Sequence, residues 1–489
     1  MPQEQGPARM MKILLASSEM HPFSKTGGLA DMTGALSKAL AEAGHQVGIV
    51  TPLYRGIFQR FPQIQRVDWR FDLPLGGKWV NAELWQLPSA RNLTVYFIHQ
   101  PDYFDRPGVY NENGVDYWDN GERFIFFSKC VAHLACYLPW QPEMVHVHDW
   151  QTALVPLLLR EEWKRRGGGG NPPRTCLTIH NLAYQGVFPA AAFALTNLPA
   201  ADFNADCCEA YGQLNCLKAG IATADLLTTV SPRYAREILT VEGGAGLDAL
   251  LRRRQADLHG IMNGVDYAEW QTENNPYLPA RYSAGNLRGK AVIKRAVLQE
   301  MRLPASPPMP LFGTVTRLAE QKGLDILIPA LHEMLHAPLR YVLLGSGNAA
   351  YEHALRQLHR RHPDKVAIRI GFDEGLSHRI EAACDIYLMP SRYEPSGLNQ
   401  MYSLRYGTIP VVRATGGLDD SVIDANESVA RANGIKFHEY SAGALAQGIR
   451  KALALYRTPS LLRQYRHNAM AADFSWARTA AQYVALYQR

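Results

Sequence analysis

The feature that most constrains the fold is an alternation of short apolar runs with stretches of helical periodicity. The predicted strands are residues 12–17, 46–51, 94–99, 144–148, 174–180, 226–230, 311–316, 340–344, 366–371 and 386–389. Continuous apolar strands separated by helices form parallel sheets that helices cover on both faces. The sequence therefore predicts an α/β protein with doubly wound parallel sheets.

The length of the chain predicts two domains. A chain of 489 residues exceeds what a single core usually supports. The best boundary lies around residues 260–266, because an irregular stretch follows it and a new run of strands begins at Leu311. We therefore expect one domain over residues 11–262 and a second over residues 263–471.

Composition narrows the class of protein. Hydrophobic residues make up 47% of the chain and charged residues 20%, as in ordinary globular proteins. No apolar run is long enough to span a membrane, so no membrane partner is expected. The polar residues 1–10 lack the apolar segment of a signal peptide and are predicted to form a disordered tail.

Charge and cysteine content argue against two kinds of partner. The net charge is +6 and no long basic block occurs, so nucleic acid is not an expected partner. The seven cysteines show no C-x-x-C spacing, which favours buried free thiols in a reducing compartment over a zinc site. No pattern in the sequence sets the number of subunits.

Two turns in the last third of the chain are candidates for binding a sugar phosphate. Glu394 follows the predicted strand 386–389, and its carboxylate can accept hydrogen bonds from a sugar hydroxyl. Thr415, Gly416 and Gly417 follow the next apolar run, and amides of a glycine turn can approach a diphosphate closely. The alternative is that both are ordinary loops between strand and helix.

A lysine-containing glycine loop follows the first predicted strand. Lys25 precedes Gly27 and Gly28, and a helical stretch begins soon afterwards. The spacing matches neither a Walker P-loop nor the dinucleotide-binding fingerprint. Lys25 is either a phosphate ligand or a solvated loop residue.

Polar residues also stand at the ends of three other predicted strands. Asp149 and His180 either line a ligand pocket or serve as a helix N-cap and a buried hydrogen-bonded imidazole, respectively. Arg317 and Lys322 flank a strand-to-helix loop, where two cations suit a diphosphate unless they are exposed surface charges.

Taken in order along the chain, these motifs resemble those of the bacterial glycogen synthases and plant starch synthases. The motifs are 25–31 (KTGGLAD), 148–150 (HDW), 178–186 (TIHNLAYQG), 263–266 (NGVD), Arg317 with 321–323 (QKG), 377–379 (SHR), 394–398 (EPSGL) and 415–418 (TGGL). The resemblance extends from about residue 12 to Trp476. It implies a GT-B fold, in which two Rossmann-like domains face a deep cleft and a last helix, residues 472–489, returns to the first domain.

The resemblance also implies a reaction and roles for single residues. In this family glucose passes from a nucleotide sugar, usually ADP-glucose, to the non-reducing 4-hydroxyl of an α-1,4-glucan with retention of configuration. The implied diphosphate ligands are Lys25, Arg317 and Lys322 with amides of Gly28, Thr415, Gly416 and Gly417. The implied sugar ligands are His180, Asn263, Glu394 and Asp149. No Asp-x-Asp triplet occurs, so neither a metal nor another cofactor is expected, and the family acts in the cytoplasm.

Some positions depart from the family or stay open. Tyr402 stands where many related retaining transferases carry a second Glu, and Ser396, Asn399 and Gln151 replace residues common in bacterial members. Phe372 either stacks on the nucleotide base or is a core residue. The alternative functions are a same-fold transferase that uses UDP-glucose, an α-glucan phosphorylase, and an inactive glucan-binding protein. A phosphorylase would need a pyridoxal-binding lysine context that is absent here, and a pure binder would not need the phosphate-gripping cations.

Overall fold

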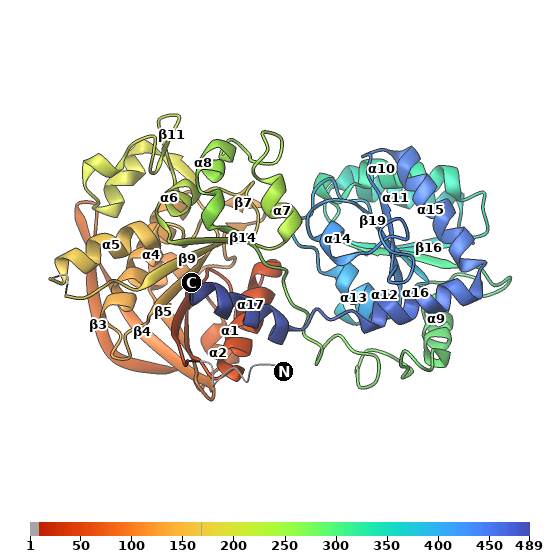
Figure 1. The fold of residues 1–489 in the computed structure, drawn as a ribbon, viewed down its shortest axis with the longest axis horizontal. Helices are drawn as coiled ribbons and strands as arrows, with labels where there is room; N and C mark the ends of the chain where they lie inside the picture. Colours follow the sequence, from red (N-terminus) through yellow and green to blue (C-terminus); the bar gives the residue numbers. More distant parts are fainter. Residues whose placement is uncertain (1–8, 168) are drawn as a thin grey trace, which may run out of the picture. The chain divides into compact units, whose positions relative to one another are not determined.

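The computed structural model describes residues 9–167 and 169–489, which form two compact units (Figure 1). The first unit contains the chain up to Val230, Ala235–Gly264 and Trp476–Arg489. The second contains Ser231–Tyr234 and Val265–Ser475. Most of the tail predicted for residues 1–10 lies outside the described residues.

The first unit is built on a nine-stranded sheet. In spatial order its strands are β14 (Leu258–Gly260), β13 (Leu226–Thr229), β9 (Arg174–Ile179), β8 (Met144–His148), β1 (Lys12–Ala16), β2 (Gln46–Pro52), β5 (Leu93–His99), β4 (Lys78–Ala90) and β3 (Gln65–Leu75). The strands from β14 to β5 are parallel, and β4 and β3 add an antiparallel edge. The predicted parallel strands are confirmed to within about a residue at each end.

The β3–β4 hairpin was not predicted. Much of β3 is exposed, and its side chains become regularly buried only towards Leu75. A strand that is half solvated carries a weaker apolar signal than the continuous buried runs of a parallel sheet. The smaller strands of this unit are β6 (Asn111–Glu112), β7 (Val115–Asp116), β10 (Val187–Pro189), β11 (Glu209–Ala210) and β12 (Gln213–Asn215).

The strand order of the first sheet reverses at β1. Strands β2 and β5 lie on one side of β1, and β8, β9 and β13 lie on the other. In open α/β sheets, ligands bind beyond the carboxyl ends of the strands at such a switch point. The loop that carries Lys25 follows β1, and Asp149 directly follows β8. Both residues are therefore at the end of the sheet where a ligand is expected.

Helices complete the first unit. They are α1 (Gly28–Glu42), α2 (Ile57–Arg60), α3 (Pro101–Phe104), α4 (Asn120–Tyr137), α5 (Val155–Arg165), η1 (Ala190–Thr196), η2 (Ala200–Asp202), α6 (Cys216–Thr223), α8 (Asp248–Arg253), η3 (Gln255–Asp257) and α17 (Trp476–Tyr487). Helix α7 (Pro232–Glu237) is divided between the two units after Tyr234. The C-terminal helix α17 packs against α1, near the start of the chain (Figure 1).

Contacts of α17 also explain where the first unit ends. The Thr479 hydroxyl donates to the carbonyl of Met262 at 3.0 Å, and Gly264 packs so closely on Trp476 that an added Cβ would lie 2.6 Å from its ring. These contacts keep Asn263 and Gly264 with the first unit, although the sequence assigned residue 263 to the second domain.

The second unit has a six-stranded, fully parallel sheet. Its strands in spatial order are β17 (Val366–Ile370), β16 (Arg340–Gly345), β15 (Leu311–Val315), β18 (Ile386–Met389), β19 (Ile409–Arg413) and β20 (Ile435–Phe437). The order reverses between β15 and β18, so the loops after these two strands meet at a second switch point. Arg317 and Lys322 follow β15, and Glu394 follows β18.

Helices cover both faces of the second sheet, as β16 shows. Tyr341 and Leu343 pack into one buried cluster with residues of α10, α11, α15 and α16, whereas Val342 and Leu344 pack into another with residues of α9 and α12. Alternate side chains of a strand point to opposite faces, so burial on both faces requires a continuous apolar run. The helices are α9 (Arg288–Glu300), η4 (Glu320–Lys322), α10 (Leu324–Met334), α11 (Ala349–Arg361), α12 (Glu374–Ala383), α13 (Asn399–Arg405), α14 (Gly416–Ser421), α15 (Ala442–Tyr456) and α16 (Pro459–Ala471).

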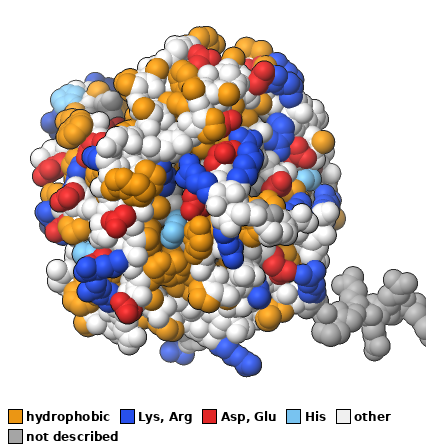
Figure 2. Space-filling model, turned by 90° about the vertical axis from the view of Figure 1, so that its left-hand side faces the viewer, with side chains coloured by type: hydrophobic (Ala, Val, Ile, Leu, Met, Phe, Trp, Pro, Cys, Tyr) orange, Lys and Arg blue, Asp and Glu red, His pale blue; other side chains and the backbone are white. Residues whose placement is uncertain are grey.

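Surface and interior match the compositional expectations. On the face shown in Figure 2, basic, acidic and apolar side chains are interspersed. None of the helices in the described part of the chain combines the length and apolarity of a membrane span. All seven cysteines are free, and all but the partly exposed Cys207 are buried, as predicted.

Candidate active site

In the first unit, the loop between β1 and α1 is anchored by a buried carboxylate. Glu19, which is 2% exposed, accepts a hydrogen bond from the Thr26 hydroxyl at 2.6 Å and another from the Thr26 amide. Tyr110 Oη donates to the same carboxylate at 2.6 Å. These bonds fix the backbone beside Lys25, so the loop has one defined course before any ligand binds.

Lys25 is half-exposed and pairs with Asp31 in the first turn of α1, at 2.7 Å. Gly28 is the first residue of α1, a helix of 15 residues whose amino end carries partial positive charge. Lys25 is therefore a cation beside a helix amino end, and Asp31 is its counter-ion in this structure. The solvated-loop alternative describes its exposure but not its ion pair.

Asp149 and His180 are brought together across β8 and β9. The Asp149 Oδ1 atom accepts a hydrogen bond from the His180 amide at 2.7 Å. Asp149 has a left-handed backbone with φ of 56°, which Asp tolerates better than most residues. The helix-cap alternative is wrong for Asp149, because the helix that follows, α5, has Leu154 at its N-cap.

Burial controls the protonation of both residues. Burial raises the pKa of Asp149 to about 7, with backbone hydrogen bonds from His180 and Asn181 opposing the rise and the nearby Glu19 charge adding to it. Burial lowers the pKa of His180 to about 3. His180 is therefore neutral at physiological pH, and Asp149 is close to its own titration point.

Asn263 lies beyond the carboxyl end of β14. Its side chain is buried, and its Oδ1 atom has no hydrogen-bond partner among the described residues. An unpaired buried carbonyl costs free energy unless a ligand or water satisfies it. This atom therefore has the hydrogen-bonding capacity that a sugar hydroxyl would use.

In the second unit, Lys322 and Glu394 form a largely buried ion pair. Lys322 Nζ lies 2.6 Å from Glu394 Oε2, and the side chains are 19% and 7% exposed. Ser391 Oγ donates to the same carboxylate oxygen at 3.0 Å. The surface-charge alternative is therefore wrong for Lys322.

Two glycines allow the loops of this half-site to approach closely. Gly323 has φ of 74°, and a Cβ there would lie 2.0 Å from the carbonyl oxygen of Pro390. Gly416 has φ of 44°, and a Cβ there would lie 2.0 Å from the carbonyl oxygen of Glu394. Only glycine combines the left-handed backbone with this lack of space. The sequence thus packs the loops after β15, β18 and β19 against one another.

The amides of this turn are partly used within the chain. Gly417 N donates to the Glu394 carbonyl at 3.0 Å, and Thr415 N donates to the Arg413 carbonyl at 2.9 Å. In this structure these two amides hold the turn against the Glu394 loop. Their predicted role as phosphate donors stays a prediction.

Arg317 and Phe372 remain open to solvent. The Arg317 side chain is exposed and has no hydrogen-bond or ion-pair partner in the described parts of the chain. Phe372, between β17 and α12, is 89% exposed. The alternative that Phe372 belongs to the core is therefore wrong, and its ring is available for stacking.

The departures from the family pattern have defined surroundings. Asn399 Nδ2 donates to Glu381 Oε1 at 2.8 Å and contacts Tyr387 Oη at 3.0 Å. The Tyr402 ring stacks on Trp270, with centroids 3.6 Å apart. Gln151 and Ser396 are buried. Asn399 thus completes a buried polar network, and Tyr402 packs on an indole.

Sequence reasoning missed three supporting residues. Glu19 anchors the Lys25 loop, Ser391 donates to Glu394, and His148 pairs with His180 at 3.1 Å. Each stands at or just beyond the end of a buried strand. That position was the available signal, because polar residues there tend to face the ligand end of a parallel sheet.

A second polar cluster lies in the second unit. In residues 9–167 and 169–489, Glu269, Glu374 and His378 bring three ligand atoms within 4.8 Å of one another. Asn275 Oδ1 accepts from the Tyr277 amide, which directs Asn275 Nδ2 at His378 Nδ1, 3.1 Å away. His378 Nδ1 also lies 2.8 Å from Tyr406 Oη, so this ring nitrogen is already engaged by side chains of the same unit.

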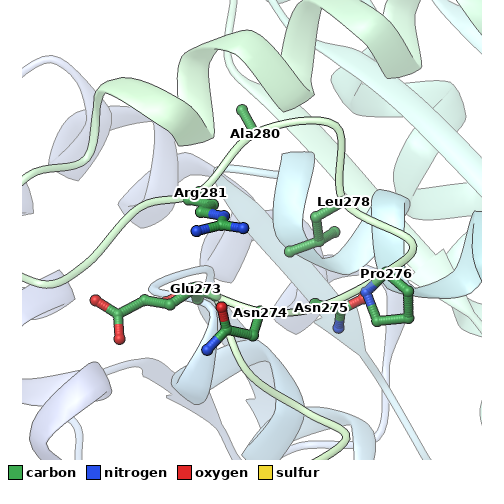
Figure 3. Close-up of a pocket in the computed structure, with 8 residues that line it drawn as sticks. Glu273, Asn274, Asn275, Pro276, Leu278, Ala280 and Arg281 are labelled. Atoms are coloured by element: carbon green, nitrogen blue, oxygen red, sulfur yellow. The ribbon is translucent and has the colours of Figure 1, made fainter.

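A cavity of about 260 Å³ lies on the same segment of the second unit, lined by Thr272, Glu273, Asn274, Asn275, Pro276, Leu278, Ala280 and Arg281 (Figure 3). Glu273, Asn274 and Arg281 lie towards one end of the view, and Leu278 and Pro276 towards the other. The cavity shares no residue with the half-site built on Lys322 and Glu394.

Comparisons with known proteins match both units. Residues 12–253 match the starch synthase catalytic domain, and residues 302–470 match the glycosyl transferases group 1. A glycogen synthase of Anaeromyxobacter dehalogenans is 50% identical over 479 residues, covering 98% of this chain and 99% of that protein. A glycogen synthase of Myxococcus xanthus is 47% identical with the same coverage.

Solved structures agree on the fold. The catalytic domain of starch synthase IV from Arabidopsis thaliana, bound to ADP and acarbose, has a TM-score of 0.88 at 32% identity and covers 98% of this chain and 99% of its own. The sucrose-phosphate synthase of Thermosynechococcus elongatus shares the fold with a TM-score of 0.60 at 18% identity. The predicted GT-B fold class, with two parallel-sheet α/β domains, is confirmed. The chain belongs to the glycogen synthase and starch synthase family of glycosyltransferases.

Proposed function

We propose that this protein is a retaining glucosyltransferase that extends glycogen. It moves glucose from ADP-glucose to the non-reducing 4-hydroxyl of an α-1,4-glucan. The glycogen synthases to which it is up to 50% identical, and the ADP-bound starch synthase of the same fold, support this activity and this nucleotide. A cytoplasmic location is part of the proposal and is supported by the free thiols of all seven cysteines.

The observation that carries the proposal is the ion pair of Lys322 with Glu394 at the second switch point. In this largely buried pair each side chain is the counter-ion of the other. When a nucleotide sugar binds, Lys322 can leave Glu394 and pair with the diphosphate. The Glu394 carboxylate can then accept a hydrogen bond from the glucose 3-hydroxyl. The ion pair thus keeps in place the two side chains that are proposed to bind the diphosphate and the glucose of the donor.

The remaining predicted residues take roles that suit their surroundings. Arg317 has an unengaged guanidinium fork for phosphate oxygens, and Lys25 adds a second cation beside the amino end of α1 at Gly28. His180 and Asn263 bind the 6-hydroxyl side of the glucose, and Asp149 lines the sugar pocket. Phe372 supplies an exposed ring for the adenine base.

The chemistry follows from where charge develops. Breaking the glycosidic bond places positive charge on the sugar ring and negative charge on the departing phosphate. Preorganised cations around the phosphate are expected to supply the largest catalytic contribution. We propose that the acceptor hydroxyl attacks on the face that the phosphate leaves, with the phosphate taking its proton and the His180 carbonyl near the reacting carbon. This route retains configuration without a carboxylate nucleophile.

Because Arg317, Lys322 and Lys25 neutralise the phosphate, the proposed reaction needs no metal. Glucosyl transfer should therefore proceed at an unchanged rate in excess EDTA. The measurement is ADP release with and without chelator, using a magnesium-dependent transferase as the control for chelation. Activity that EDTA abolishes and magnesium restores would contradict this part of the proposal.

One assay separates the proposed function from its alternatives. The protein is incubated with glycogen and either ADP-glucose or UDP-glucose, and release of the nucleoside diphosphate is followed. Faster ADP release supports the proposal, and faster UDP release supports the alternative donor. Release of neither, with glycogen still bound, identifies an inactive glucan-binding protein.

A further inference from the structure

The side chain of His180 is itself held by a second histidine. His148 Nδ1 lies 3.1 Å from His180 Nε2, and the two residues end or follow the neighbouring strands β8 and β9. The proposed function gives His180 a role at the sugar, whereas His148 has no role in it. The bond leaves Nδ1 as the other hydrogen-bonding atom of the His180 ring.

The His148 ring is fixed on its other side as well. It is fully buried and lies against the ring of His146, with centroids 4.2 Å apart. Both nitrogens of His146 are engaged, Nδ1 with Tyr487 Oη at 2.7 Å and Nε2 with Thr178 Oγ1 at 2.6 Å. Tyr487 belongs to α17, so the C-terminal helix helps to hold this stack in place.

Both rings of the pair are neutral. Burial, together with the neighbouring histidines, lowers the pKa of His148 well below its usual range, and burial lowers that of His180 to about 3. Two neutral imidazoles that face each other share one N–H group, which belongs to one ring or the other. The position of this proton decides what His180 offers to a ligand.

The environment of His148 Nε2 settles the choice. This atom is buried and has no partner among the described residues. If His180 Nε2–H donated to His148 Nδ1, the neutral His148 ring would carry its own proton on Nε2. That N–H group would be buried without an acceptor. If His148 donates instead, only a lone pair is left there. Buried N–H groups without an acceptor are rarer than under-used acceptors, so donation by His148 is favoured.

We propose that His148 is a positioning residue that makes His180 a hydrogen-bond donor at Nδ1. His180 Nδ1–H then points at a ligand atom that must be an acceptor, which is a hydroxyl oxygen of the donor sugar. This inference rests on the proposed function for the identity of the ligand. It does not rest on that function for the position of the proton.

The first test determines which ring nitrogen of His180 is protonated, and it needs no substrate. The full-length protein is labelled with ¹⁵N-histidine, and long-range ¹H–¹⁵N spectra report which nitrogen of each ring is protonated. The signals of His180 are those lost in His180→Gln. We expect a protonated Nδ1 and an unprotonated Nε2. A protonated Nε2 on His180 would overturn the proposal, whatever reaction the protein catalyses.

The second test uses two variants whose effects on packing and on hydrogen bonding oppose each other. His148→Phe keeps a ring in the stack but removes the partner of His180. His148→Asn loses the ring but keeps an amide near the place of Nδ1, where it can donate. Thermal unfolding should therefore show that the Asn variant is the less stable of the two.

Activity should follow the opposite order. We expect kcat/KM for ADP-glucose to fall about tenfold to a hundredfold in His148→Phe and only a few-fold in His148→Asn. Removing the 6-hydroxyl of the donor should cost wild type more than it costs His148→Phe. Activity that instead follows stability would assign His148 a structural role and overturn the proposal. If wild type transfers no glucose from ADP-glucose, the proposed function fails, and the ¹⁵N spectra alone decide the position of the proton.

Discussion

The two units end their central strands with different kinds of polar group. At the switch point of the first unit the polar groups are neutral or nearly so: His180, Asn263 and an Asp149 whose pKa is raised to about 7. At the switch point of the second unit the groups are charged: Arg317 and the pair of Lys322 with Glu394. Neutral groups depend little on ionic strength and charged groups depend on it strongly, so substitutions at the two switch points should differ in size and in response to pH and salt.

The largest expected effect comes from removing the buried cation. Lys322→Ala should lower turnover by roughly a hundredfold to a thousandfold, because one preorganised donor to a developing anion contributes roughly 3–4 kcal/mol. Binding of glycogen should change little. Steady-state ADP release and glycogen co-sedimentation measure the two effects.

The matched control for this variant is Lys451→Ala, which removes an exposed lysine from α15 of the same unit. It should leave turnover unchanged. Wild-type turnover in Lys322→Ala would show that Lys322 is not an active-site residue. It would also show that this charge of the second unit does not contribute to catalysis.

The next effect tests the near-neutral character of the first unit. The pKa of Asp149 is raised from an ordinary 3.8 to about 7, so the folded state keeps a proton that the unfolded state has lost. Wild type should therefore lose stability relative to Asp149→Asn as the pH rises from about 4 to about 7, with no further change above that window. Because Asp149 is partly exposed, the change is on the order of 2 kcal/mol.

Urea unfolding of wild type and Asp149→Asn across this pH range measures the effect. Asparagine keeps an oxygen that can accept from the His180 amide, so the comparison isolates the charge. A stability difference that does not vary with pH would show that Asp149 is ionised throughout, and the contrast between the units would be weaker than described.

A smaller effect is expected from changing the shape of a charge in the second unit. Arg317→Lys keeps the positive charge but loses the planar fork that binds two phosphate oxygens at once. We expect kcat/KM for ADP-glucose to fall about tenfold, or about 1.4 kcal/mol. Arg356→Lys, on the exposed face of α11, is the control. Equal activity of Arg317→Lys and wild type would mean that Arg317 acts only through its charge.

The sequence predicted the parallel core and the position of polar residues at strand ends for one reason. Strands buried on both faces read as continuous apolar runs, and ligand residues follow their carboxyl ends, so β8 and Asp149 were predicted together. The half-solvated hairpin β3–β4 carries no such run and was missed.

Hydrogen-bond partners from different loops or distant parts of the chain could not be predicted from the sequence either. The bond of His146 to Tyr487 and the bond of Glu19 to Thr26 depend on which loops the fold brings together. Protonation was likewise hidden, because the raised pKa of Asp149 is caused by burial that no local motif encodes. Motifs indicated the candidate residues, and the fold was needed to show how they are held.

The smallest effect is expected for Lys25, the cation proposed to bind phosphate from the first unit. Lys25 and its partner Asp31 are 51% and 31% exposed, compared with 19% and 7% for Lys322 and Glu394. An exposed charge is screened by water and salt, and it must give up rotamer freedom before it can hold a phosphate. Lys25→Ala should therefore weaken ADP binding only about threefold to tenfold, and by less at high ionic strength.

Calorimetric titration with ADP measures this effect on affinity. The control is Lys38→Ala, which removes another exposed ion-paired lysine of α1 and should have no effect. If Lys25→Ala lowers ADP affinity as much as Lys322→Ala does at every salt concentration, burial does not determine how strongly a cation binds phosphate here. The contrast drawn between the two units would then be wrong for their cations.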